Sequence, residues 1–141
     1  MSVMAYTVTV DVRYEGDLEC TLTHGPSGDV MKTDAPVDNR GRGLRFSPTD
    51  LVGAGMGSCM LTVMGIVARD RGWDMTGATA RVVKEMGAQP RRHIAKLDVE
   101  ITLPAALDEK ARAILERTAY TCPVHASLGE MTKVNLTFHY V

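Results

Sequence analysis

The stretch SPTDLVGAGMGSCMLTVMGIVARD, residues 47–70, decides the fold because it predicts one long apolar helix. Ser47 can cap the N-terminus of this helix, Pro48 suits its first position, and Asp50 sits where a carboxylate bonds back to the cap. The pair Arg71-Gly72 follows, and a glycine at this point is typical of a helix end.

Residues 51–68 carry no charge, over a length that would also suit a transmembrane segment. We favour the central helix of a soluble fold, because much of the stretch consists of small residues, including Gly53, Gly55, Gly57 and Gly65. A helix that is apolar on nearly every side must be enclosed. A chain of 141 residues has little left with which to surround it, so we expect a partner subunit.

The segments on either side of this helix predict strands with alternating apolar and polar residues. Before it, residues 6–13, 18–22 and 29–32 predict an antiparallel meander. After it come two long strands near residues 76–86 and 93–103, an amphipathic helix at 107–120 and a last strand at 133–140. This order predicts an α+β fold in a single domain over residues 1–141, not an alternating parallel sheet.

Composition narrows the class of function. The formal net charge of -1 argues against a general nucleic-acid binder, which normally has a surplus of basic residues. The first ten residues contain no basic segment and no small-residue cleavage site, so we expect no signal peptide and a cytoplasmic protein. Three cysteines in such a compartment act as core residues, metal ligands or catalytic thiols.

Cys59 falls in the third turn of the long helix, among apolar and small neighbours. A thiol buried in such surroundings is inert, and the sequence alone favours a core role. A catalytic role needs a cation or a hydrogen-bond donor that stabilises the thiolate. The polar loop of residues 33–45 lies just before the helix and could supply the cation by folding back, through Arg40, Arg42 or Arg45.

Cys122 is followed by Pro123, which predicts a cysteine at a helix N-cap, where unpaired amides favour a thiolate. His125 lies in the next turn and could add charge or a proton. A structural and a redox interpretation carry equal weight here. Cys20 is in phase with Leu18 and Leu22 and is interpreted as a core residue.

Two other interpretations stay open at this point. Two cysteines together with His24 and His125 could meet in space and bind Zn²⁺, although no metal-ligand spacing indicates it. The nine methionines suit an adaptable apolar pocket for a small ligand and equally suit ordinary packing. Asp50 is explained by capping, although a carboxylate there could also orient an arginine above a thiol.

The run FSPTDLVGAGMGSC, residues 46–59, followed much later by Cys122-Pro123-Val124, resembles the OsmC family, which includes the organic hydroperoxide resistance proteins. That family typically shows Asn or Ser, Pro, any residue, Glu or Asp, and Leu, then small residues, then a cysteine in the central helix and a second Cys-Pro later. The resemblance covers nearly the whole chain. It is closer to the general OsmC-like branch, including YhfA-like proteins, than to the dedicated resistance proteins.

The resemblance implies an OsmC-like fold in which antiparallel sheets wrap a long central helix in an intertwined homodimer. It also implies that Cys59 is the peroxidatic thiol, that Cys122 is the resolving thiol, and that an external dithiol of lipoyl or thioredoxin type regenerates the pair. The family's acidic partner falls at or beside Asp50. Arg40, Arg42 and Arg45 are our own candidates for the cation, since the motif transfers no arginine to this loop.

The leading hypothesis is therefore a cysteine-based thiol peroxidase for organic hydroperoxides that needs no cofactor, no metal, no nucleic acid and no membrane. The alternative is a non-catalytic dimer of the same fold that binds a small apolar ligand or serves a structural role.

Overall fold

The computed structural model describes residues 5–141, which form two compact units that meet within the first turns of the long helix. One unit ends at Leu51 and the other spans Val52–Val141. Each unit is described by itself.

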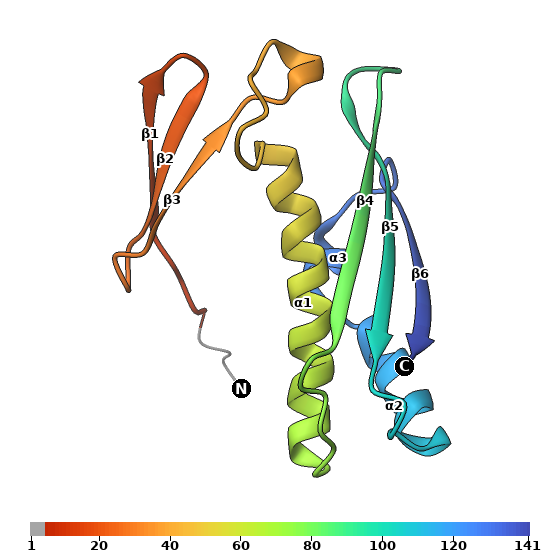
Figure 1. Cartoon of the computed structure of the whole chain (residues 1–141). Helices are drawn as coiled ribbons and strands as arrows, with labels where there is room; N and C mark the ends of the chain where they lie inside the picture. Colours follow the sequence, from red (N-terminus) through yellow and green to blue (C-terminus); the bar gives the residue numbers. More distant parts are fainter. Residues whose placement is uncertain (1–4) are drawn as a thin grey trace. The chain divides into compact units, whose positions relative to one another are not determined.

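The N-terminal unit is built on a three-stranded antiparallel sheet in the order β1-β2-β3, which confirms the predicted meander (Figure 1). Its strands are β1 (Val10–Gly16), β2 (Glu19–His24) and β3 (Val30–Asp34). Asp17 and Leu18, in the tight turn between β1 and β2, both adopt positive φ. The pairing places Glu19 directly opposite Asp34, so two acidic residues lie side by side where β2 begins and β3 ends.

Backbone hydrogen bonds hold the polar loop after β3 in a closed conformation. It contains a short 3-10 turn, η1 (Val37–Asn39), and closes through a hydrogen bond from Asp34 N to Phe46 O. Gly41 N donates to Pro36 O at 2.9 Å, and a Cβ at Gly41 would lie 1.6 Å from Ala35 O. Only glycine fits this close approach of the backbone.

The long helix α1 runs over Pro48–Asp70, as the sequence predicts. Its start is a reciprocal cap: Asp50 N donates to Ser47 Oγ at 3.0 Å, and Ser47 N donates to Asp50 Oδ2 at 2.9 Å. Two backbone donors that would otherwise lack partners are thereby satisfied.

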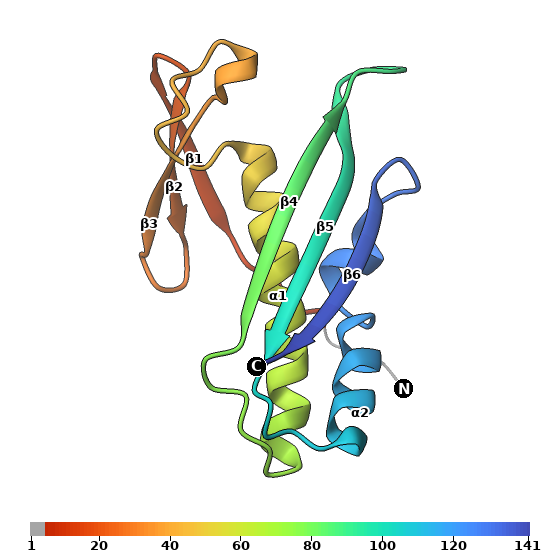
Figure 2. The same cartoon turned by 45° about the vertical axis from the view of Figure 1, so that its right-hand side comes forward.

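The C-terminal unit carries a second sheet in the order β4-β5-β6, with the helices on one of its faces (Figures 1 and 2). Its strands are β4 (Thr79–Gly87), β5 (His93–Leu103) and β6 (Lys133–Tyr140). The expectation of purely antiparallel sheets is wrong here, since β5 pairs with β6 in parallel. A parallel pair needs a crossover, which α2 (Glu109–Ala119) and α3 (Pro123–Ser127) supply.

Apolar side chains from α1, the sheet and α2 form the core of this unit. Fully buried positions alternate along β5, as expected for a strand with one face turned inward. The largest buried core side chains are Met56, Met60, Met64, Leu97, Ile101, Leu103 and Leu115. α1 approaches the sheet through glycine: a Cβ at Gly57 would lie 3.0 Å from Val82 Cγ2.

In the structure of residues 5–141, part of the opposite side of α1 is exposed. Ile66 keeps 56% of its surface exposed, and the positions one, two and three turns before it, Thr62, Ser58 and Ala54, are also exposed. That a partner subunit covers this side stays a prediction. By length and composition alone, α1 would suit a membrane span, and a third of its most apolar window is buried.

Gly57 faces the sheet closely, whereas nothing lies near Gly65, so replacing each of them tests this packing. Gly57→Leu should lower the free energy of unfolding by about 1–3 kcal/mol, because the added side chain must displace Val82. Gly65→Leu should raise it by about 0.5–1 kcal/mol, because nothing lies within 4 Å of a Cβ there and leucine favours helix. Urea denaturation measures both, and equal effects at the two positions would contradict the contact.

Candidate functional site

Cys59 lies in α1 at the boundary between the core and the surface. Its side chain packs against the core cluster and remains half-buried. Met56, three residues before Cys59, and Met60, directly after Cys59, are fully buried. The helix therefore holds Cys59 against the core, with the residue as a whole only partly buried.

Cys122 lies near Cys59 and belongs to the crossover between β5 and β6. Helix α2 begins at an Asp108 side chain that accepts a hydrogen bond from Ala111 N, and it ends at Ala119. Three residues later Cys122 forms the N-cap of α3, with Pro123 at the first helical position, as the sequence predicts. Its side chain is completely buried.

The two thiols lie close enough to influence each other, although 62 residues separate them in the chain. The Cys59 side chain raises the pKa of Cys122, and both cysteines are free thiols. One is half-exposed and the other fully buried. The structure thus brings together the two cysteines that the sequence singled out, in an asymmetric pair.

Burial raises the pKa of the Cys122 thiol, and the neighbouring Cys59 side chain raises it further. The backbone N–H groups of His125 and Val124 act in the opposite direction and lower it, as an N-cap position should. The net shift is upward. The N-cap amides favour a thiolate at Cys122, as the sequence predicts, but loss of solvation outweighs them. His125 acts on Cys122 through its backbone N–H.

A third sulfur atom joins the pair. Cys122 Sγ donates to Met56 Sδ at 4.0 Å, a contact between two fully buried side chains. The sequence offered Met56 only as one of nine methionines and as a neighbour of Cys59 on the helix face. Its place beside Cys122 depends on the crossover, which no local pattern reveals.

The candidate arginines of residues 33–45 belong to the N-terminal unit, where acidic residues bind two of them. Glu19 accepts from Arg45 Nη1 at 2.6 Å and pairs with Arg42 Nη2 at 3.2 Å. Arg42 Nε also lies 3.8 Å from Asp34 Oδ2. Glu19 and Asp34 were missed from the sequence, and their cross-strand pairing was the only signal that could have identified them.

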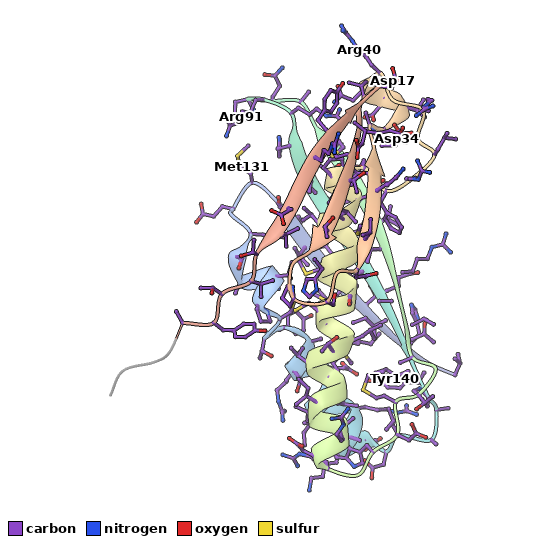
Figure 3. The ribbon with its side chains drawn as sticks, turned by 90° about the vertical axis from the view of Figure 1, so that its left-hand side faces the viewer. Asp17, Asp34, Arg40, Arg91, Met131 and Tyr140 are labelled. Atoms are coloured by element: carbon purple, nitrogen blue, oxygen red, sulfur yellow. The ribbon has the colours of Figure 1, made fainter. Side chains whose placement is uncertain are left out.

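Arg40 differs from its two neighbours. It adopts a left-handed backbone conformation with φ of 67° at the end of η1. Figure 3 shows its side chain extending away from the ribbon, at the end of the N-terminal unit that also carries Asp17 and Asp34. Asp50 takes part in the cap of α1, which confirms the structural half of its predicted role.

The remaining candidates have local explanations. Cys20 is half-buried in β2, opposite Tyr14 and Thr33. His24 Nδ1 lies 2.6 Å from Ser27 Oγ within the β2–β3 turn. Over residues 5–141, no three His, Cys, Asp or Glu side chains are close enough to hold a metal ion, so the zinc interpretation has no support there.

Comparison with known proteins identifies the relatives of this chain. The family model described as OsmC-like protein matches residues 41–137. A crystal structure from Psychrobacter arcticus, described as a candidate osmotic stress induced and detoxification response protein, is 42% identical, with a TM-score of 0.88 over 99% of this chain and 100% of that one. None of the curated proteins compared with the chain matches it.

Two more distant structures share the fold. The organic hydroperoxide resistance protein of Elizabethkingia anophelis, with a crystallant-derived thiocyanate bound, is 16% identical, with a TM-score of 0.77 over 98% of this chain and 99% of that one. The organic hydroperoxide resistance protein OsmC of Legionella pneumophila is 17% identical, with a TM-score of 0.73 over 97% and 99%.

The raised pKa of Cys122 makes stability depend on pH. The unfolded chain ionises this thiol near its ordinary value of about 8.5, whereas the folded protein keeps the proton to higher pH. Above that value the unfolded state binds fewer protons, so the free energy of unfolding falls as pH rises. Urea denaturation from pH 7 to about pH 10 should show this decline, and Cys122→Ala should flatten it. A decline of equal slope in Cys122→Ala would contradict the assignment.

Proposed function

The chain belongs to the OsmC-like protein family, and from this we propose that it is a cysteine-based thiol peroxidase that reduces organic hydroperoxides. Cys59 is the peroxidatic thiol and Cys122 the resolving thiol. The observation that carries the proposal is the proximity of the two cysteines, one half-buried and one fully buried, at which the Cys59 side chain raises the pKa of Cys122.

In the first step, the Cys59 thiolate attacks the terminal oxygen of the hydroperoxide. The O–O bond breaks, the sulfur becomes a sulfenic acid, and the alkoxide leaves as an alcohol after taking up a proton. Sulfur is oxidised by two electrons and the peroxide is reduced by two. Partial exposure of Cys59 suits it to meet the substrate, whereas buried Cys122 is shielded.

In the second step, the Cys122 sulfur attacks the sulfenic sulfur. An S–S bond forms, the S–O bond breaks, and hydroxide leaves as water with the proton of the Cys122 thiol. An external dithiol then reduces the Cys59–Cys122 disulfide and is itself oxidised. Apolar surroundings of the pair favour an organic hydroperoxide over hydrogen peroxide, since its carbon chain gains from leaving water.

The first step needs a cation near Cys59 to stabilise the thiolate. Arg40, Arg42 and Arg45 are our candidates, with Asp50 as the acidic group that orients one of them. Since Glu19 already binds Arg42 and Arg45, recruiting either requires Glu19 to release it. We further propose a homodimer, because a second copy of the chain would cover the exposed side of α1, including Ile66.

A stoichiometric oxidation tests the central claim. One equivalent of cumene hydroperoxide should convert Cys59 and Cys122 of the reduced protein to a disulfide, which peptide mass spectrometry identifies. Cys59→Ser should lower the rate of peroxide consumption at least about a hundredfold, and Cys20→Ser, the matched control, should leave it unchanged. If both thiols of the wild-type protein stay free, or if Cys59→Ser consumes peroxide at the wild-type rate, the peroxidase proposal fails.

Single replacements in the loop identify the cation. Arg40→Gln, Arg42→Gln and Arg45→Gln should be compared under one set of conditions, and the residue that stabilises the thiolate should lower kcat/KM about tenfold to a hundredfold when replaced. Asp50→Asn keeps an oxygen that can accept from Ser47 N, so it removes charge while preserving the cap. Wild-type kcat/KM in all four variants would reject the loop and Asp50 as catalytic groups.

The engagement of Arg42 and Arg45 by Glu19 favours a second candidate, a non-catalytic dimer that binds a small apolar ligand. Native mass spectrometry of the freshly purified protein distinguishes the two functions. A ligand that co-purifies, combined with thiols that peroxide does not oxidise, would favour binding over catalysis.

A further inference from the structure

Three sulfur atoms meet in the core of the C-terminal unit, and one of them has no role in the reaction proposed above. Met56 Sδ lies 4.0 Å from Cys122 Sγ, and both side chains are fully buried. Met56 also precedes Cys59 by three residues on α1, so the two share one face of the helix. The thioether is therefore held beside the thiol pair by the same helix that carries Cys59.

In the contact between Cys122 and Met56, only Cys122 can be the hydrogen-bond donor. A thioether sulfur has no proton and can only accept, so the hydrogen bond exists only while Cys122 is a protonated thiol. If Cys122 ionised, an anionic sulfur would face the lone pairs of a second sulfur, in a place with no water to solvate it. A hydrogen bond to the neutral form of a group disfavours its charged form.

We propose that Met56 is a positioning residue that keeps the proton on Cys122 and holds the thiol in place until Cys59 has been oxidised. The contact itself is independent of any reaction, whereas its role in the order of oxidation rests on the proposed peroxidase function.

Other groups around Cys122 act alongside this contact. Burial and the neighbouring Cys59 side chain both raise the pKa of Cys122, whereas the backbone N–H groups of Val124 and His125 lower it. Among the described residues, Cys59 on α1 is the one titratable side chain that shifts this pKa. Met56 adds to the side that favours the thiol and opposes the amides of α3.

The retained proton has two consequences in the reaction. A protonated Cys122 is a poor nucleophile toward peroxide, so Cys59 alone is oxidised first. When the Cys59 sulfenic acid then forms, the same proton leaves with its hydroxyl as water: sulfenic acid plus thiol gives disulfide plus water. Met56 thus helps to ensure that Cys59 reacts with the peroxide first and Cys122 reacts only afterwards.

The first test observes the hydrogen bond without any oxidation. In a Cys20→Ser, Cys59→Ser background, Cys122 is the one remaining thiol, and its S–H stretching band is read by infrared spectroscopy. Adding Met56→Leu, a volume-conserving change, should move this band to higher frequency because the acceptor is lost. Met64→Leu is the matched control, since Met64 is equally buried on the same helix, and it should leave the band in place.

The second test measures Cys122 as a nucleophile in a Cys20→Ser background that retains Cys59. Excess dithiodipyridine first forms a mixed disulfide with the more exposed Cys59, and Cys122 then displaces the second thiopyridone, which absorbs light. In Met56→Leu, Cys122 should lose its proton more readily because its acceptor is gone. The second phase should therefore become about twofold to threefold faster at neutral pH, and its pH midpoint should move downward. Met64→Leu should match the parent.

The outcomes separate the inference from the proposed function. An unmoved S–H band, or a second phase with an unchanged or raised pH midpoint in Met56→Leu, overturns the role of Met56. A moved band and a lowered midpoint support it, even if cumene hydroperoxide fails to oxidise the wild-type protein. That failure would instead reject the peroxidase and leave Met56 as the residue that keeps Cys122 protonated.

Discussion

The close packing of α1 against the second sheet is the constraint on which the rest of the C-terminal unit depends. Glycine at position 57 lets the helix approach Val82, while Met56, Met60 and Met64 fill the space between helix and sheet. Because the helix is held in this orientation, the direction in which each of its side chains points is fixed. Cys59 then falls at the edge of the core, where a thiol can be both anchored and partly open to solvent.

The parallel pairing of β5 and β6 supplies the second half of the site. Parallel neighbours cannot be joined by a tight turn, so the chain must cross over the sheet through α2 and α3. The crossover brings Cys122 into the core, against which Cys59 also packs. Burial raises the pKa of Cys122 and outweighs the helix amides, so the buried thiol keeps its proton to higher pH.

The N-terminal unit shows why resemblance to a family does not assign every role. Solved structures that are 42% and 16% identical to this chain share its fold, so the architecture tolerates extensive change in sequence. In this chain the arginines before α1 are partly neutralised by Glu19 and Asp34, which the register of β2 and β3 sets side by side. For Arg42 or Arg45 to serve as the proposed cation, it would first have to leave its ion pair, which Arg40 would not need to do.

Local sequence determined the elements of this protein: the Ser47–Asp50 cap, the length of α1, the alternating strand β6 and the Cys122-Pro123 helix start all follow from contacts between residues close in the chain. The tertiary structure alone decided the parallel register of β5 and β6, the capture of Arg42 and Arg45 by Glu19, and the meeting of Met56, Cys59 and Cys122. The sequence predicted the effect of the N-cap amides on Cys122 but not the burial that outweighs it. Capping is a short-range effect visible in sequence, whereas desolvation depends on distant segments that pack around a group only after folding.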